Sequence, residues 1–146
     1  MGSRPKANRW KGVPLSEIFY GPSANRVVAE QWFPAMDLCE SEEEVIIRLE
    51  VPGVLAADLG VTVVGRTVKV EGIKREPDFA DQEKIRFLCL ERGYGPFQKL
   101  VELEWVVDPR RTTAVLRNGV LIIRLPKIPE RRGAPLEIPI RGSDQN

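Results

Sequence analysis

Apolar and polar residues alternate along several stretches of this chain with the period of two that half-buried β-strands require. In the clearest stretch, residues 45–51, the alternating apolar positions are Val45, Ile47, Leu49 and Val51. Pro52-Gly53 is a turn signal that ends this stretch. The same pattern predicts a short strand over 35–39, a third strand with Leu59, Val61 and Val63 on one face, and a fourth with Val68 and Val70.

The strongest local signal is a β-hairpin at Asn118-Gly119, between the β-prone runs 112–117 and 120–125. Asn-Gly supplies the positive φ angles that a two-residue hairpin turn needs. Pro126 lacks an amide hydrogen, so we expect the second strand to stop at Leu125.

The second hairpin strand is apolar on both faces. Leu121, Ile123 and Leu125 share one face, and Ile122 and Arg124 share the other. We therefore expect cover on both sides, from a second sheet on one and from a strand, a subunit or a bound protein on the other.

Residues 1–33 form an arm in which aromatic and aliphatic residues are scattered among prolines, glycines and polar residues. Leu15, Ile18 and Phe19 have i, i+3, i+4 spacing, which predicts a short amphipathic helix over residues 14–19. Such a helix is too short to be stable alone. The alternative interpretation is a disordered leader.

Three blocks of the chain resemble the signatures of one family. Ala114, Asn118-Gly119-Val120-Leu121, Ile123 and Pro126-Lys127 resemble the A-x-x-x-n-G-V-L-x-I-x-x-P-K motif that closes the α-crystallin domain of small heat-shock proteins. Residues 51–53 with 58–63 resemble that family's V-P-G and D-(L/I)-x-V-x-V block. Glu91-Arg92, Gly95, Phe97 and Leu103 resemble its E-R-x-x-G-x-F-x-R-x-x-x-L-P segment. Two positions depart from it, because Lys99 stands where arginine is usual and Glu104 where proline is usual. Without that proline we expect a longer strand over residues 101–107.

The resemblance implies an all-β fold, an immunoglobulin-like β-sandwich (the α-crystallin domain), over residues 34–126. It also implies a flexible N-terminal arm over 1–33 and a C-terminal tail over 127–146. In that tail Ile138, Pro139 and Ile140 are similar to the family's I-x-I anchor, which docks into an edge groove of a neighbouring subunit. The groove would be lined by Val61, Val63, Ala114 and Leu116.

The resemblance further implies a dimer built by strand exchange. Residues 74–84 are polar and predict a long exposed loop, after which residues 85–90 return to strand composition. In similar bacterial and plant proteins this segment, here 84–92, crosses to the partner subunit. The expected dimer-interface residues are Ile85, Phe87, Cys89, Glu91, Arg92, Met36 and Leu38.

Three residues leave alternatives open. Cys39 and Cys89 are either small buried apolar residues or, if residues 85–90 pair with the partner's residues 34–39, thiols that could form an intersubunit disulfide. Arg92 is either a surface charge or an ion-pair partner at the dimer interface. Trp105 is expected in the core.

Composition excludes several classes of function. The chain has 146 residues and no histidine, so the commonest general base and the commonest metal ligand are both missing. Its formal net charge is +1, so no overall electrostatic field favours binding to nucleic acid. We find no phosphate-binding glycine loop, no nucleophile elbow, no C-x-x-C pair, no signal-peptide core and no membrane span. The sequence predicts a cytoplasmic protein that is not an enzyme, with no catalytic residues, no metal and no cofactor.

The resemblance and the missing catalytic groups together predict an ATP-independent holdase chaperone. It would bind non-native client proteins and assemble through its dimers into a larger homo-oligomer. The client-binding residues would come from the arm: Trp10, Leu15, Ile18, Phe19, Trp32 and Phe33. The alternative is a monomeric co-chaperone or adaptor of the same sandwich fold that binds one specific folded partner.

Overall fold

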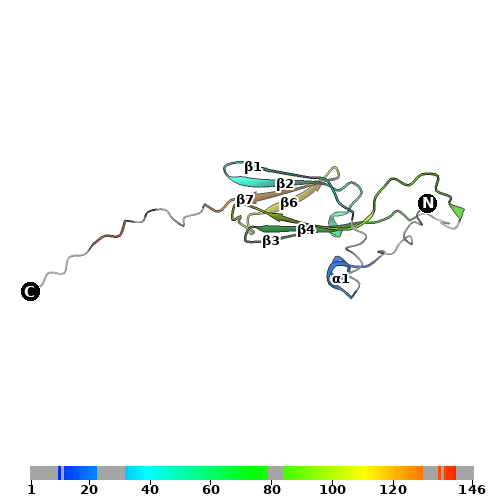
Figure 1. The fold of residues 1–146 in the computed structure, drawn as a ribbon, viewed down its shortest axis with the longest axis horizontal. Coiled ribbons are helices and arrows are strands. Elements are labelled where there is room, and N and C mark those ends of the chain that lie inside the picture. The colour runs from blue at the N-terminus through cyan, green and yellow to red at the C-terminus, as the bar shows by residue number, and fades with distance from the viewer. Residues whose placement is uncertain are drawn as a thin grey trace, which may run out of the picture.

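The computed structural model describes residues 10, 12–22, 32–78, 84–129, 135 and 137–140, and within them the chain forms two antiparallel β-sheets (Figure 1). The four-stranded sheet has the order β1-β2-β7-β6 and the three-stranded sheet the order β3-β4-β5. The strands are β1 (Met36–Glu40), β2 (Glu44–Glu50), β3 (Leu59–Val64), β4 (Thr67–Lys74), β5 (Gly95–Glu102), β6 (Thr113–Arg117) and β7 (Val120–Pro126). The predicted all-β sandwich is confirmed.

The period-two pattern places one face of each central strand in a shared core between the two sheets. In β2 the residues Val45, Ile47 and Leu49 are buried, and they pair in antiparallel register with the buried face of β7. In β4, Val68 and Val70 are fully buried. Side chains alternate sides along a strand, so each sheet contributes every second residue to the core.

The hairpin forms as predicted at Asn118-Gly119. Both residues have positive φ, 52° and 75°, which the type I′ turn requires. Strand β7 runs one residue further than expected, to Pro126, which pairs with Glu44 of β2. The proline carbonyl also accepts a hydrogen bond from the Asp108 amide at 2.8 Å, a contact that needs no proline N–H.

The expected long strand over residues 101–107 is wrong. Strand β5 ends at Glu102, which pairs with Thr67, the first residue of β4. The amide of Leu103 instead donates to the carbonyl of Arg66 in the preceding turn, so no partner strand remains beyond this point. Val107 makes an isolated bridge with Lys127.

The segment after β4 also differs from the expected exposed loop. Lys74 is buried as the last residue of β4, and Arg75 is half-buried. Residues 85–92 form no strand within the single chain, and they lie on a loop that projects from one end of the sandwich (Figure 1).

The predicted arm helix is present as α1 (Leu15–Tyr20) and lies on the outer face of the three-stranded sheet. Ile18 is 1% exposed and packs with Ile73 of β4, surrounded by Trp10, Val13, Leu15 and Phe19. A short 3-10 helix, η2 (Ala56–Asp58), leads into β3. The arm residues 1–9, 11, 23–31 lie outside the described residues.

Candidate assembly and client-binding surfaces

The predicted tail anchor extends away from the sandwich. Ile138 is 77% exposed and Ile140 is 98% exposed, and Pro139 between them is exposed as well. Two isoleucines one residue apart in an extended segment present their side chains to the same side. The single chain therefore leaves both of them without apolar cover.

The predicted groove residues lie on two edge strands, β3 of one sheet and β6 of the other. Val61, Val63 and Leu116 are half-buried and pack against the main core, whereas Ala114 is exposed. Each edge strand also leaves one row of backbone hydrogen-bonding groups unpaired within the chain, as edge strands do. The two edge strands therefore offer both apolar side chains and unpaired backbone hydrogen-bonding groups, which an added extended segment could bind.

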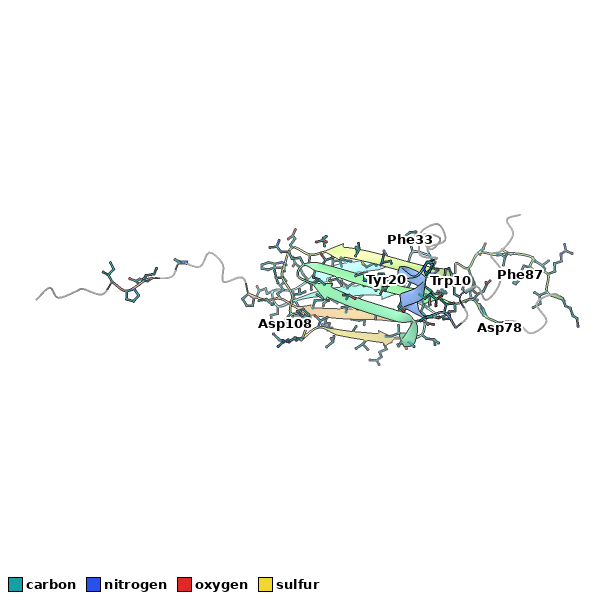
Figure 2. The ribbon with its side chains drawn as sticks, turned by 90° about the horizontal axis from the view of Figure 1, so that it is seen from below. Trp10, Tyr20, Phe33, Asp78, Phe87 and Asp108 are labelled. Carbon is teal, nitrogen blue, oxygen red and sulfur yellow. The ribbon has the colours of Figure 1, made fainter. Side chains whose placement is uncertain are left out.

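The predicted dimer-interface residues come from two separate regions. Strand β1, the opposite edge of the four-stranded sheet, carries Met36, which packs against the core, and Leu38, which is 47% exposed. Ile85 and Phe87 are partly exposed on the projecting loop, where Figure 2 labels Phe87 well away from the sandwich. Cys89, Glu91 and Arg92 on the same loop are exposed.

The predicted client-binding residues of the arm do not form one surface. Trp10, Leu15, Ile18 and Phe19 gather around Ile73. Trp32 lies elsewhere, with its ring edge-on to Phe97 at 5.5 Å between centroids, and its amide donates to the Pro96 carbonyl. Phe33 is 66% exposed. Of these six predicted residues, all but Phe33 pack against the sandwich in this conformation.

Two expectations about single residues are wrong. Cys39 and Cys89 are both free and exposed, so they are not buried apolar residues. Trp105 is 39% exposed, and the ammonium group of Lys127 lies 4.3 Å from its ring centroid, because the backbone has left the sheet at Glu102. Arg92 places its guanidinium 5.1 Å from the Tyr94 ring centroid.

A polar contact that the sequence analysis missed fixes the start of the tail. The Lys127 Nζ lies 2.9 Å from Glu40 Oε2 and donates to the Ser41 carbonyl at 2.7 Å. The backbone amides of Lys127 and Ile128 donate to the carbonyls of Glu43 and Val106. The only signal in the sequence was the Pro126-Lys127 end of the motif, which did not reveal these partners.

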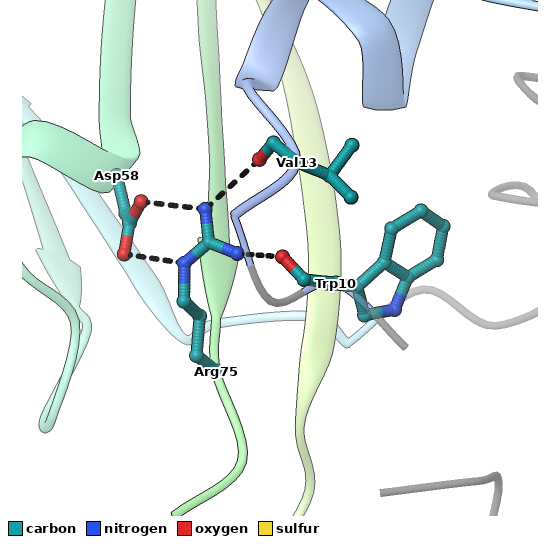
Figure 3. A network of polar contacts seen from close by, with 4 residues as sticks. All are labelled: Trp10, Val13, Asp58 and Arg75. Atoms are coloured by element: carbon teal, nitrogen blue, oxygen red, sulfur yellow. Dashed lines mark hydrogen bonds and ion pairs between the residues drawn. The ribbon is translucent and has the colours of Figure 1, made fainter. Parts of the chain in front are cut away.

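A second missed contact joins the arm to the sandwich. The Arg75 guanidinium makes two hydrogen bonds of 2.9 Å to the carboxylate of Asp58 and also donates to the carbonyls of Trp10 and Val13 (Figure 3). Asp58 belongs to a matched motif, but its partner lies 17 residues away in a stretch that reads as a polar loop.

Two lysines among the described residues have shifted pKa values. Burial lowers the pKa of Lys74, whose ammonium lies 5.0 Å from the Trp32 ring centroid. A hydrogen bond with the Tyr20 hydroxyl raises the pKa of Lys69. In the part of the chain that the structure describes, no three cysteine, aspartate or glutamate side chains cluster as metal ligands, and no helix is long and apolar enough to cross a membrane.

Comparison with known proteins places this sandwich in a family. The model of the Hsp20/alpha crystallin family matches residues 37–141, so the chain belongs to that family. It is 36% identical over 122 residues to spore protein SP21 of Stigmatella aurantiaca, covering 84% of this chain and 71% of the relative. It is 26% identical over 105 residues to small heat shock protein C4 of Rickettsia felis, covering 72% of this chain and 63% of that relative, slightly under two thirds of its length.

A solved structure agrees with the sequence relatives. The fold superposes on a small heat-shock protein from Xylella fastidiosa with a TM-score of 0.59 at 27% identity, covering 80% of this chain and 99% of that one. The predicted resemblance to small heat-shock proteins is confirmed.

Proposed function

We propose that this protein is an ATP-independent holdase chaperone that binds unfolding proteins in the cytoplasm and keeps them from aggregating, with no catalytic step. Membership of a small heat-shock protein family supports a chaperone role. The observation that carries the proposal is the set of large apolar side chains that the chain leaves exposed on its edge strand, loop and tail: Leu38, Ile85, Phe87, Ile138 and Ile140.

Assembly through the tail accounts for Ile138 and Ile140. We propose that they dock between β3 and β6 of a neighbouring subunit, against Val61, Val63, Ala114 and Leu116. Burying each isoleucine contributes about 1.5–3 kcal/mol, while ordering the tail costs about 1 kcal/mol or more per residue. One such contact is weak, and dimers carrying two tails gain strength through effective concentration.

The dimer would form by exchange of residues 84–92. That segment has no strand partner within its own chain, and β1 leaves one edge open. Adding the segment to the partner's β1 would satisfy both sets of backbone groups and cover Leu38. Glu91 and Arg92 would then lie at the dimer interface.

The test is the light scattering of malate dehydrogenase unfolding at raised temperature without nucleotide. We expect the full chain, in excess, to suppress the scattering. Unchanged scattering would contradict the holdase proposal. A monomer in size-exclusion light scattering, together with no suppression, would instead favour the adaptor alternative and direct the search to one folded partner.

A further inference from the structure

The outer face of the three-stranded sheet carries an apolar residue, Ile73, that the arm covers. Along β4, Val68 and Val70 face the core between the sheets, and Ile73 lies on the opposite side of the strand. Ile73 is nevertheless fully buried, because Ile18 of α1 packs on it. If α1 moved away, Ile73 and the apolar side of α1 would both meet water.

Helix α1 has little capacity to hold itself in place. It is six residues long, it follows Pro14 without a side-chain cap, and isolated helices of this length do not persist in water. Its persistence therefore depends on the contacts it makes with the sandwich.

Arg75 supplies a contact at the start of the helix. Its Nε and Nη2 each lie 2.9 Å from an oxygen of Asp58, its Nη2 donates to the Val13 carbonyl at 3.1 Å, and its Nη1 donates to the Trp10 carbonyl. The two carbonyls belong to one turn, closed by a hydrogen bond from the Val13 amide to the Trp10 carbonyl with Gly12 at φ 70°. Figure 3 shows the guanidinium between the carboxylate and this turn.

The geometry needs an arginine. A planar guanidinium can bind a carboxylate through two parallel hydrogen bonds and still direct donors to other acceptors, whereas a lysine ammonium lacks this fork. Asp58 orients the guanidinium from the sandwich side, at the end of η2. Arg75 and its ion-pair partner are half-buried, so salt screens the pair less than a fully exposed one.

The far end of α1 is held less firmly. The Tyr20 hydroxyl donates to Glu71 Oε2 at 3.0 Å and accepts from Lys69, but Tyr20 is 61% exposed. Because the tyrosine side chain is largely exposed, water competes with Glu71 and Lys69 for its hydroxyl, so these hydrogen bonds contribute little.

We propose that Arg75 and Asp58 form a latch that keeps α1 docked over Ile73 and so withholds the apolar surface of α1 and Ile73 from non-native polypeptide. Opening the latch frees α1, and the exposed side chains of Leu15, Ile18, Phe19 and Ile73 then become available to apolar client segments. The identity of the binder rests on the holdase function proposed above, whereas the latch itself does not.

The experiment compares the full wild-type chain with Arg75→Lys and the near-isosteric Asp58→Asn. Arg124→Lys is the matched control, because Arg124 also pairs with a carboxylate, that of Glu44, but on the other sheet and without touching the arm. Hydrogen exchange is read at the amides of Ile18 and Gly21, which hydrogen-bond within the arm. The core amides of Ile47 and Ile123 report whether each variant remains folded.

We expect exchange at Ile18 and Gly21 to become at least tenfold faster in both latch variants, with core exchange and the Arg124→Lys control unchanged. Suppression of malate dehydrogenase scattering should then occur at a lower chaperone concentration. Unchanged arm exchange in both variants would overturn the latch. Faster arm exchange with unchanged suppression would overturn the claim that the latch withholds a client surface. If the wild type suppresses no scattering, the holdase proposal fails, and the exchange data still decide whether the latch exists.

Discussion

The ammonium group of Lys127 lies 2.9 Å from Oε2 of Glu40, which ties the residue after β7 to the last residue of β1. The same ammonium lies 4.3 Å from the ring centroid of Trp105. The tail of this Hsp20-family chain thus leaves the sandwich from a point fixed by three separate segments. Arg75 makes the corresponding contact for the arm, where it binds the carbonyls of Trp10 and Val13.

The contact makes the pKa of the Glu40 carboxyl depend on Lys127. A hydrogen bond from Lys127 lowers the pKa of Glu40 below its ordinary 4.5, with burial acting in the opposite direction. Because the folded-state pKa is the lower one, the stabilisation is fully present above about pH 4.5 and is lost as pH falls through the folded-state pKa. We expect an NMR titration to give a Glu40 pKa below 4.5 that returns toward 4.5 in Lys127→Met. Lys69→Met, which removes an amine from the other sheet, should leave it unchanged.

Close packing at Gly72 predicts a clear stability difference between two glycines of paired strands. A Cβ at Gly72 would lie 2.7 Å from a ring atom of Phe97 and 2.8 Å from the Leu59 side chain, and the aromatic ring is held in the core. We expect Gly72→Ala to lower the free energy of unfolding by about 1–3 kcal/mol. At Gly60 a Cβ would meet only the flexible Glu71 side chain at 3.4 Å, so Gly60→Ala is the control. Urea denaturation measures both, and equal losses would contradict the packing argument.

The hairpin turn predicts that substitutions at Gly119 and at its neighbour Asn118 change the thermal midpoint by different amounts. Gly119 has φ 75°, and a Cβ there would lie 3.2 Å from the Cα of Pro52. A residue other than glycine in that conformation costs about 1–3 kcal/mol, so Gly119→Ala should lower the thermal midpoint. Asn118→Gly keeps the positive φ accessible and should change the midpoint far less. A midpoint for Gly119→Ala equal to that of the wild type would show that the turn does not restrict this position.

The proposed tail anchor predicts that the particle mass depends on the two exposed isoleucines of the tail. Ile138→Ala/Ile140→Ala should convert large particles to dimers in size-exclusion light scattering, because both anchoring side chains are removed. Ile128→Ala is the matched control: it removes the same side chain from the same tail, but from a residue whose amide is held by the Val106 carbonyl. Unchanged particle mass in the double variant would contradict assembly through the tail.

The exchanged dimer predicts an oxidation product. Cys39 lies on β1, and Cys89 lies on the segment that we propose to cross to the partner's β1; both thiols are free and exposed. Mild oxidation should give a dimer band on non-reducing gels, and either Cys39→Ser or Cys89→Ser should abolish it. A band that survives one of these substitutions would mean that like cysteines pair, which contradicts the proposed arrangement.

The local pattern of residues determined much of this fold. The alternation over 45–51 predicted β2, Asn118-Gly119 predicted the hairpin, and the spacing of Leu15, Ile18 and Phe19 predicted α1. These features depend on short-range sterics and on side chains that alternate or recur along a few residues, so the sequence contains them directly.

Other features were decided only by the tertiary structure. Strand β5 ends at Glu102 because β4 begins at Thr67, a partner 35 residues away that no local pattern reveals. From the sequence, Arg75 is one more residue of a polar loop. Only the folded chain places it next to Asp58 and the Trp10 carbonyl of the arm. Lys127 likewise acquires its partners from β1 and from the segment after β5. A hydrogen bond or ion pair depends on distances in space, and those exist only once the two sheets have packed.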